Sequence, residues 1–138
     1  MKGFRKTLGA RGEEIACEHM RSLGFSITVR NVNVSHDEID IVAEDDETIV
    51  FVEVKSRAAT CQSKRFGPPS TAVDQTKKER LIRSSGEYLR RNQTTKRPRI
   101  DVIEVVFPPV SEDTPIDISK LLPISVKHFK NAVIKGKI

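Results

Sequence analysis

Two carboxylates and a lysine stand close together near the middle of the sequence, in two runs of strand-forming residues. Asp40 lies in the first run, and Glu53 and Lys55 end the second, at residues 48–55. Side chains alternate along a β-strand, so Glu53 and Lys55 share one face, about 6.6 Å apart along the strand. The acidic residues 44–47 between the runs are typical of a hairpin turn, which puts Asp40 on the neighbouring strand.

The position of the turn sets the level of Asp40 along its partner strand. In a tight hairpin centred near residues 45–46, Asp40 lies level with residues 50–51. A bulge or a twist is then needed to bring its carboxylate beside Glu53. The opposite face of the Asp40 strand is expected to be core, formed by Ile39, Ile41 and Ala43.

These three side chains are the groups that metal-assisted phosphodiester hydrolysis requires. A divalent cation binds a phosphate oxygen and lowers the pKa of the attacking water, and Mg²⁺ takes one or two carboxylates plus waters and phosphate oxygens. Asp40 and Glu53 can supply the carboxylates. Lys55 is a compact cation that can orient the water and stabilise negative charge in the transition state. The alternative is a structural ion pair at the strand end, since buried charges are costly unless paired.

A helix is expected before these strands, at residues 7–23, because apolar side chains and two glycines recur on one face at about 100° per residue. That face comprises Leu8, Gly9, Gly12, Ile15, Ala16, Met20 and Leu23. Its glycines would let the helix lie close to a sheet, and Gly24 is the expected end. Glu13 falls at the edge of the face, where it can look inward, and Glu14 points to solvent. For Glu13 the alternative is a solvated carboxylate near the helix N-terminus.

The remaining pattern predicts a mixed α/β domain, a mixed sheet flanked by helices in the order αβββαβ. The run at residues 48–55 is apolar on both faces until its end, which is typical of a central strand covered on both sides. The other strands are expected at residues 25–34, 38–43 and 99–107. A second helix is expected at residues 75–92 and a short third one at 126–133. The second helix has Asp74 as N-cap, and its inner face is Leu81, Ile82, Ser85 and Leu89.

The length of 138 residues fits a single domain. We expect a core at about residues 7–107 and a C-terminal extension at 108–138. The net charge of +5 favours a polyanionic partner, nucleic acid first and an anionic membrane surface second. No apolar run approaches the length of a membrane span and no signal peptide is expected. Cys17 and Cys61 lack metal-site spacing and are expected to be reduced thiols in a cytoplasmic protein.

Basic residues are concentrated in the second helix and just after it. Four of the basic residues are expected to contact a phosphate backbone without reading bases. They are Lys77, Lys78 and Arg80, near the start of this helix, and Arg57, just after the strand at residues 48–55. A solvated helix face is the alternative. The few aromatic residues argue against a platform for stacking single-stranded bases. The three histidines, His19, His36 and His128, are expected at the surface.

The sequence resembles a known family at several points in the same order. Asp40 followed at thirteen residues by Glu53-Val54-Lys55 resembles the PD-(D/E)xK nuclease superfamily. The larger set resembles the YraN-like family of small bacterial proteins, which are regarded as distant relatives of archaeal Holliday junction resolvases. That set comprises residues 12–16, 31, 38–41, 51–57, 66–68, 72–73 and 101–102, with a fainter likeness at 128 and 131–132. The chain departs from the family at Asp37, where the family usually has Gly.

The resemblance implies a restriction-endonuclease-like core in which Asp40 and Glu53 bind Mg²⁺ or Mn²⁺ and Glu13 leans into the metal site. We therefore expect a Mg²⁺-dependent endonuclease that acts on DNA more readily than on RNA, with branched or structured DNA as a substrate by analogy. Resolvases cut two sites on a four-way junction, so a homodimer is expected. The alternatives are a nucleic-acid-binding module that has lost turnover and a partner-binding structural protein whose acids form ion pairs.

Overall fold

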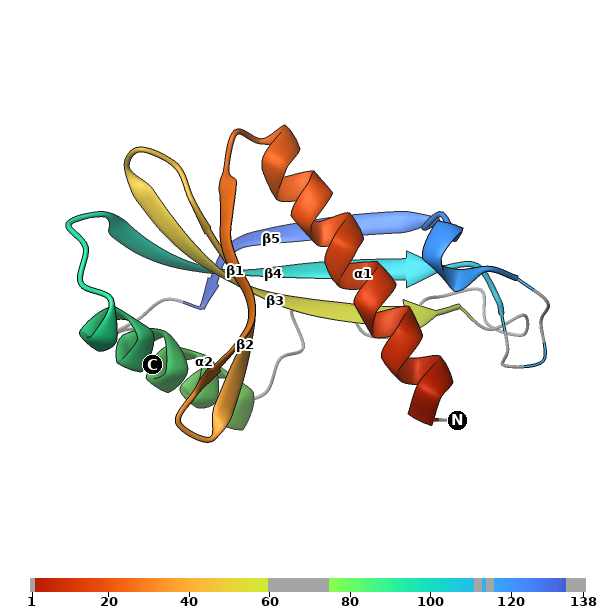
Figure 1. The fold of residues 1–138 in the computed structure, drawn as a ribbon, viewed down its shortest axis with the longest axis horizontal. Helices are drawn as coiled ribbons and strands as arrows, with labels where there is room; N and C mark the ends of the chain where they lie inside the picture. Colours follow the sequence, from red (N-terminus) through yellow and green to blue (C-terminus); the bar gives the residue numbers. More distant parts are fainter. Residues whose placement is uncertain (1, 60–74, 111–112, 114–115, 134–138) are drawn as a thin grey trace.

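The computed structural model describes residues 2–59, 75–110, 113 and 116–133, and in this part of the chain two α-helices pack on one mixed sheet (Figure 1). The predicted N-cap Asp74, Cys61 and the loop before the second helix lie outside the described residues. The elements, in chain order, are α1 Lys2–Ser22, β1 Ser26–Val34, β2 Asp37–Glu44, β3 Thr48–Ala58, α2 Gln75–Arg91, β4 Arg97–Phe107, the short 3₁₀ helix η2 Ile118–Lys120 and β5 Ser125–Val133.

The five described strands follow one another in the sheet in chain order, β1-β2-β3-β4-β5. β3 and β4 are parallel and pair along their full length, from Thr48↔Arg97 to Ala58↔Phe107. The other three pairs are antiparallel. A parallel connection needs a crossover, and α2 lies between β3 and β4 in the chain. The predicted mixed α/β architecture is confirmed, and β3 is a central strand as expected.

Alternating side chains of β3 build two cores, one under each helix. Val50 and Val52 pack in the cluster that includes Ile15, Ala16 and Met20 of α1, and Figure 1 shows α1 crossing that face of the sheet. Ile49 and Phe51 pack in the cluster that includes Leu81 and Tyr88 of α2. The Phe51 and Tyr88 rings meet edge to face at 5.5 Å. The same alternation puts Glu53 and Lys55 on the face of the sheet that α2 covers.

The first helix begins earlier than the sequence indicated and ends where Gly24 predicted. Gly24 has a φ of 97°. The Gly24 and Phe25 N–H groups donate to the carbonyls of Arg21 and Met20, at 3.0 and 3.1 Å, which closes the helix in a Schellman arrangement. Leu23 lies beyond the last turn and is 44% exposed, so its predicted place in the core is wrong. Cys17, buried within the helix, packs on that face.

One of the two glycines on the α1 face is required for close packing. A Cβ on Gly12 would lie 1.7 Å from the Ser56 Oγ and 2.8 Å from the Ser56 Cβ, so α1 approaches β3 closely there. A Cβ on Gly9 would meet no atom within 4 Å. The predicted close approach therefore holds at Gly12 and is wrong at Gly9.

The C-terminal extension forms a strand, and the predicted helix at residues 126–133 is wrong. β5 pairs antiparallel with β4, from Val106↔Ser125 to Ile100↔Val133. The residues of β4 from Ile100 to Phe107 are buried. Without β5, this strand would be at the edge of the sheet. The gain from covering this edge outweighs the local helical spacing of apolar residues. None of the described helices is both long enough and apolar enough to cross a membrane.

Candidate active site

Asp40 and Glu53 lie near each other where the regular pairing of the β2–β3 hairpin ends. The two strands pair from Glu44↔Ile49 to Ile41↔Val52 with no irregularity, and Asp40 comes one residue past the last pair. The expected level of Asp40 near residues 50–51 is therefore wrong, since these residues pair with Ala43 and Val42. The turn is centred later than the sequence indicated, because the Asp45 N–H donates to the Thr48 carbonyl at 3.0 Å. Glu53 lies on the α2 side, where its carboxylate contacts Lys77 and Arg80, and its charge acts on Asp40.

The Asp40 carboxylate lies where β2 and β3 separate. Regular pairing ends at Ile41↔Val52, and beyond it the Asp40 Oδ2 accepts a hydrogen bond from the Val54 N–H at 2.8 Å. A side chain thus satisfies a backbone donor of β3 past the last paired residue. Ile39 is buried as predicted, but it packs in the cluster under α2, whereas Ile41 and Ala43 pack under α1. The regular alternation of side chains between the two faces of the sheet is therefore interrupted in β2 near Asp40.

The surroundings of Asp40 disfavour its ionised form. Burial, followed by the nearby Glu53 charge, raises the pKa of Asp40 to about 7, although the Val54 hydrogen bond opposes the shift. The charges of Glu13 and Glu38 raise the pKa of Asp40 further. Two carboxylates this close create a place where a cation is favoured.

Glu13 points inward from α1, as the sequence predicted, and its Oε1 lies 3.9 Å from the Arg30 Nη2. Its side chain is 18% exposed, against 52% for Glu14. Burial raises the pKa of Glu13, opposed by a hydrogen bond with Asn31 and by the Arg30 charge. The charge of Glu53 also raises the pKa of Glu13, which shows that the two carboxylates lie within electrostatic range.

Glu53 is engaged by two cations of α2. Its Oε2 lies 3.2 Å from the Arg80 Nη2 and 3.6 Å from the Lys77 Nζ, and its side chain is only 9% exposed. Lys77 and Arg80 therefore point into the carboxylate cluster, whereas the sequence suggested an outward basic surface. Lys78, beside them on α2, is half-buried.

Lys55 and Arg57 continue the same face of β3, and both lie next to a buried acid that the sequence analysis missed. Lys55 is level with Glu104 in the parallel β3–β4 register. The Arg57 Nε lies 3.5 Å from the Glu104 Oε2, whose side chain is 4% exposed. An acid inside the apolar run of β4 was the available indication, since such a residue is rarely buried unless it is paired.

The donor set suits a hard divalent cation. Asp40 and Glu53 offer carboxylate oxygens, the ligand type that Mg²⁺ and Mn²⁺ prefer, and a bound cation would offset the burial and acidic neighbours that raise the pKa of Asp40. Across the described residues, no three His, Cys, Asp or Glu side chains already converge as a metal site. Glu53 is turned toward α2, so binding a metal there requires this side chain to exchange partners.

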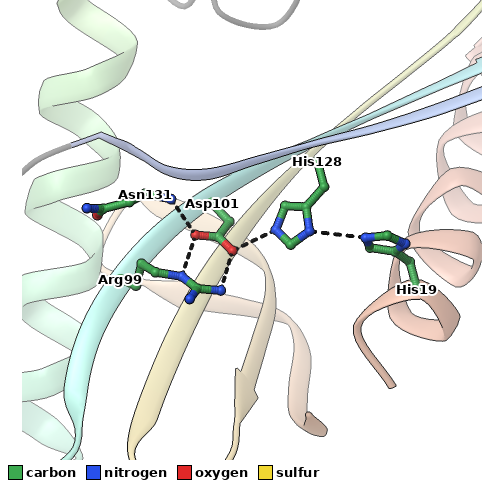
Figure 2. Close-up of polar contacts among 5 residues, drawn as sticks. All are labelled: His19, Arg99, Asp101, His128 and Asn131. Carbon is green, nitrogen blue, oxygen red and sulfur yellow. Dashed lines mark hydrogen bonds and ion pairs between the residues drawn. The ribbon is translucent and has the colours of Figure 1, made fainter. Parts of the chain in front are cut away.

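The surface position predicted for His128 and His19 is wrong. Figure 2 shows a polar chain in which the His128 Nε2 lies 2.7 Å from the Asp101 Oδ2, and the His128 Nδ1 lies 3.1 Å from the His19 Nε2. Arg99 makes two hydrogen bonds to the Asp101 carboxylate, and the Asn131 N–H donates to it at 2.8 Å. Asp101 is fully buried where the β4–β5 register shifts, so this network fastens β5 to β4 and to α1. His36 is exposed as expected.

Fold and site together define a mixed α/β domain that gathers carboxylates where its second and third strands separate. Residues 12–105 match the uncharacterised protein family UPF0102, and the chain belongs to this family. The predicted membership of the YraN-like family is thereby confirmed. The matched segment runs from α1 into β4 and includes Glu13, Asp40, Glu53 and Lys55.

Several UPF0102 proteins are similar to the chain over most of its length. The Clostridium perfringens strain ATCC 13124 protein is 40% identical over 108 residues, which cover 78% of this chain and 85% of that protein. The Caldicellulosiruptor saccharolyticus protein is 39% identical over 118 residues, covering 84% and 96%. The Caldanaerobacter subterraneus subsp. tengcongensis protein is 35% identical over 129 residues, covering 93% and 95%.

Proposed function

We propose that this protein is a divalent-cation-dependent endonuclease with a restriction-endonuclease-like core, hydrolysing phosphodiester bonds in DNA. The observation that carries the proposal is the Asp40 carboxylate, which binds the Val54 N–H just past the last pair of β2 with β3 and lies within electrostatic range of Glu53. Glu53 is paired with Lys77 and Arg80, as a structural ion pair would be. Asp40 differs, because burial and neighbouring acids raise the pKa of Asp40 to about 7, and shifts of this size are typical of functional sites.

Asp40 and Glu53, with Glu13 as a third carboxylate, would hold Mg²⁺ or Mn²⁺. Such an ion, when bound, polarises the phosphate and lowers the pKa of the attacking water. The Val54 N–H fixes Asp40 at 2.8 Å, which keeps this carboxylate in place before the ion arrives.

The cations around the cluster have separate tasks in this proposal. Lys55 shares the face of Glu53 on β3, so its ammonium group orients the attacking water and stabilises charge that develops on the phosphate. Lys77, Lys78 and Arg80 of α2, with Arg57 of β3, contact the phosphate backbone. These contacts carry no base recognition, in keeping with a net charge of +5 and few aromatic residues.

Cleavage assays test the proposal. The protein is incubated with supercoiled, linear, single-stranded and four-way-junction DNA, and with RNA, in Mg²⁺ or Mn²⁺. Asp40→Asn and Lys55→Ala are run in parallel. We expect cleavage that requires the metal and is lost in both variants. Preference for the junction would extend the proposal to branched DNA, and a homodimer in solution is then expected because the junction has two cut sites.

The competing hypothesis is a nucleic-acid-binding module without turnover. The engagement of Glu53 by Lys77 and Arg80 is the observation that favours it, since cations occupy a position that catalysis gives to a metal. Salt-sensitive binding without cleavage of any substrate would support the module. Absence of both binding and cleavage at low salt would refute both hypotheses.

A further inference from the structure

The two carboxylates of the site are held by partners of different kinds. Asp40 is fixed by a backbone N–H, which stays where β3 places it. Glu53 is held by the side chains of Arg80 and Lys77, which are flexible and which are 37% and 34% exposed to solvent. Side-chain cations at a solvent boundary can change partners by rotating, whereas a strand N–H cannot.

A divalent cation and the α2 side chains require the same carboxylate. The Arg80 guanidinium and the Lys77 ammonium group both contact the Glu53 Oε2, and their positive charges repel an incoming cation. Both are also well suited to phosphate, because a guanidinium pairs with two phosphate oxygens at once and an ammonium group binds phosphate as a point charge.

We propose that Lys77 and Arg80 form a latch on Glu53 that a phosphodiester backbone opens, so that nucleic-acid binding and divalent-cation binding at Asp40 and Glu53 favour each other. The inference rests on the proposed function and assigns these two residues a second role within it. A backbone phosphate takes the cations from Glu53, which frees the carboxylate for the metal. Linkage requires the converse as well, so a bound metal that captures Glu53 releases the cations for phosphate.

The same helix provides a matched control for Arg80. Arg83 lies three residues further along α2, and its Nη2 pairs with the Asp37 Oδ2 at 3.1 Å. Both arginines therefore make one ion pair with a carboxylate of the β2–β3 hairpin, but only Arg80 holds a carboxylate of the proposed site. Arg80→Gln removes a latch cation, Arg80→Lys keeps its charge, and Arg83→Gln removes an equal charge elsewhere.

Mn²⁺ binding measured by titration calorimetry tests the latch without relying on cleavage. In the absence of DNA we expect Arg80→Gln to bind Mn²⁺ about tenfold more tightly than the wild type, corresponding to loss of one charged hydrogen bond. Arg83→Gln and Arg80→Lys should stay close to the wild type. A short DNA duplex with hydrolysis-resistant phosphorothioate linkages should tighten Mn²⁺ binding by the wild type several-fold, and by Arg80→Gln much less.

The outcomes separate the latch from the function on which it rests. Asp40→Asn reports whether Mn²⁺ binds at the proposed site. If binding depends on Asp40 but Arg80→Gln matches the wild type with and without DNA, the latch is refuted and the proposed metal site stands. If no Asp40-dependent binding occurs under either condition, the proposed function fails and the latch with it. If Arg80→Gln does not fold, the wild type decides, since DNA that leaves its Mn²⁺ affinity unchanged overturns the coupling.

Discussion

Asp40→Asn should make the metal-free protein more stable, although it removes a proposed catalytic group. Burial and the Glu53 charge raise the pKa of Asp40 from 3.8 to about 7, so the native state disfavours the ionised carboxylate. A rise of that size corresponds to roughly 4 kcal/mol at about 1.4 kcal/mol per pH unit, as an upper limit. Because Asp40 titrates together with Glu53 and the site can relax, we expect a gain of about 1–3 kcal/mol.

The sign and the pH window follow from the same shift. The folded-state pKa of Asp40 is raised, so its contribution to the free energy of unfolding is fully present below pH 3.8. That contribution is lost as the pH rises through 7. Asparagine does not titrate, and its side-chain carbonyl can still accept the hydrogen bond from the Val54 N–H. The advantage of Asp40→Asn should therefore be small near pH 4 and largest above pH 7.

Urea unfolding in EDTA across this pH range measures the effect. Asp45→Asn serves as a control of opposite sign, because hydrogen bonds from the Glu47 and Thr48 N–H groups lower the pKa of Asp45. That substitution should destabilise the protein at neutral pH, with the difference disappearing as the pH falls below 3.8. If Asp40→Asn left the free energy of unfolding unchanged at pH 8, or lowered it, the raised pKa inferred for Asp40 would be wrong.

Three further substitutions test the packing that positions the site. Gly12→Ala should cost about 1–3 kcal/mol of stability, because a Cβ would lie 1.7 Å from the Ser56 Oγ. Gly9→Ala is the control, since its Cβ would meet no atom within 4 Å. Equal urea midpoints for the two variants would contradict the close approach of α1 to β3. His128→Ala should cost about 1–3 kcal/mol of stability, because it removes a partner of the buried Asp101 carboxylate. If the amides of β5 kept their protection in hydrogen exchange, His128 would not be fastening that strand. Gly86 lies in the interior of α2, and a Cβ added there would meet no atom within 4 Å. Gly86→Ala should therefore raise the free energy of unfolding by about 0.5–1 kcal/mol. A lower melting temperature would refute this prediction.

Local pattern was sufficient for the parts of the fold that depend on one element. The end of α1 at Gly24, the bounds of α2 and the shared face of Glu53 and Lys55 all follow from the periodicity of a single helix or strand. The level of Asp40 was missed because it depends on turn geometry, and a small shift of the turn centre moved it one residue past the last pair, Ile41↔Val52.

The contacts that the sequence analysis missed join residues far apart in the chain. Asp101 meets His128 27 positions later, and His128 meets His19 109 positions away, so no window of sequence contains the network. β5 was mistaken for a helix for the same reason, since its pairing with β4 is decided by the edge that it covers. The direction of Lys77 and Arg80 toward Glu53 likewise depends on how α2 lies on the sheet.

The location of the carboxylate cluster follows from the unequal pairing of β3 with its two neighbours. β4 pairs with β3 over its whole length, from Thr48 to Ala58, whereas β2 pairs only as far as Val52. Beyond that point β2 no longer pairs with β3, and the Asp40 carboxylate accepts a hydrogen bond from the Val54 N–H. The half-buried Asp40 lies within electrostatic range of Glu53, and the charge of Glu13 reaches the same carboxylate from α1. The early end of one strand pair thus allows acids from both faces of the sheet to lie within electrostatic range of one another.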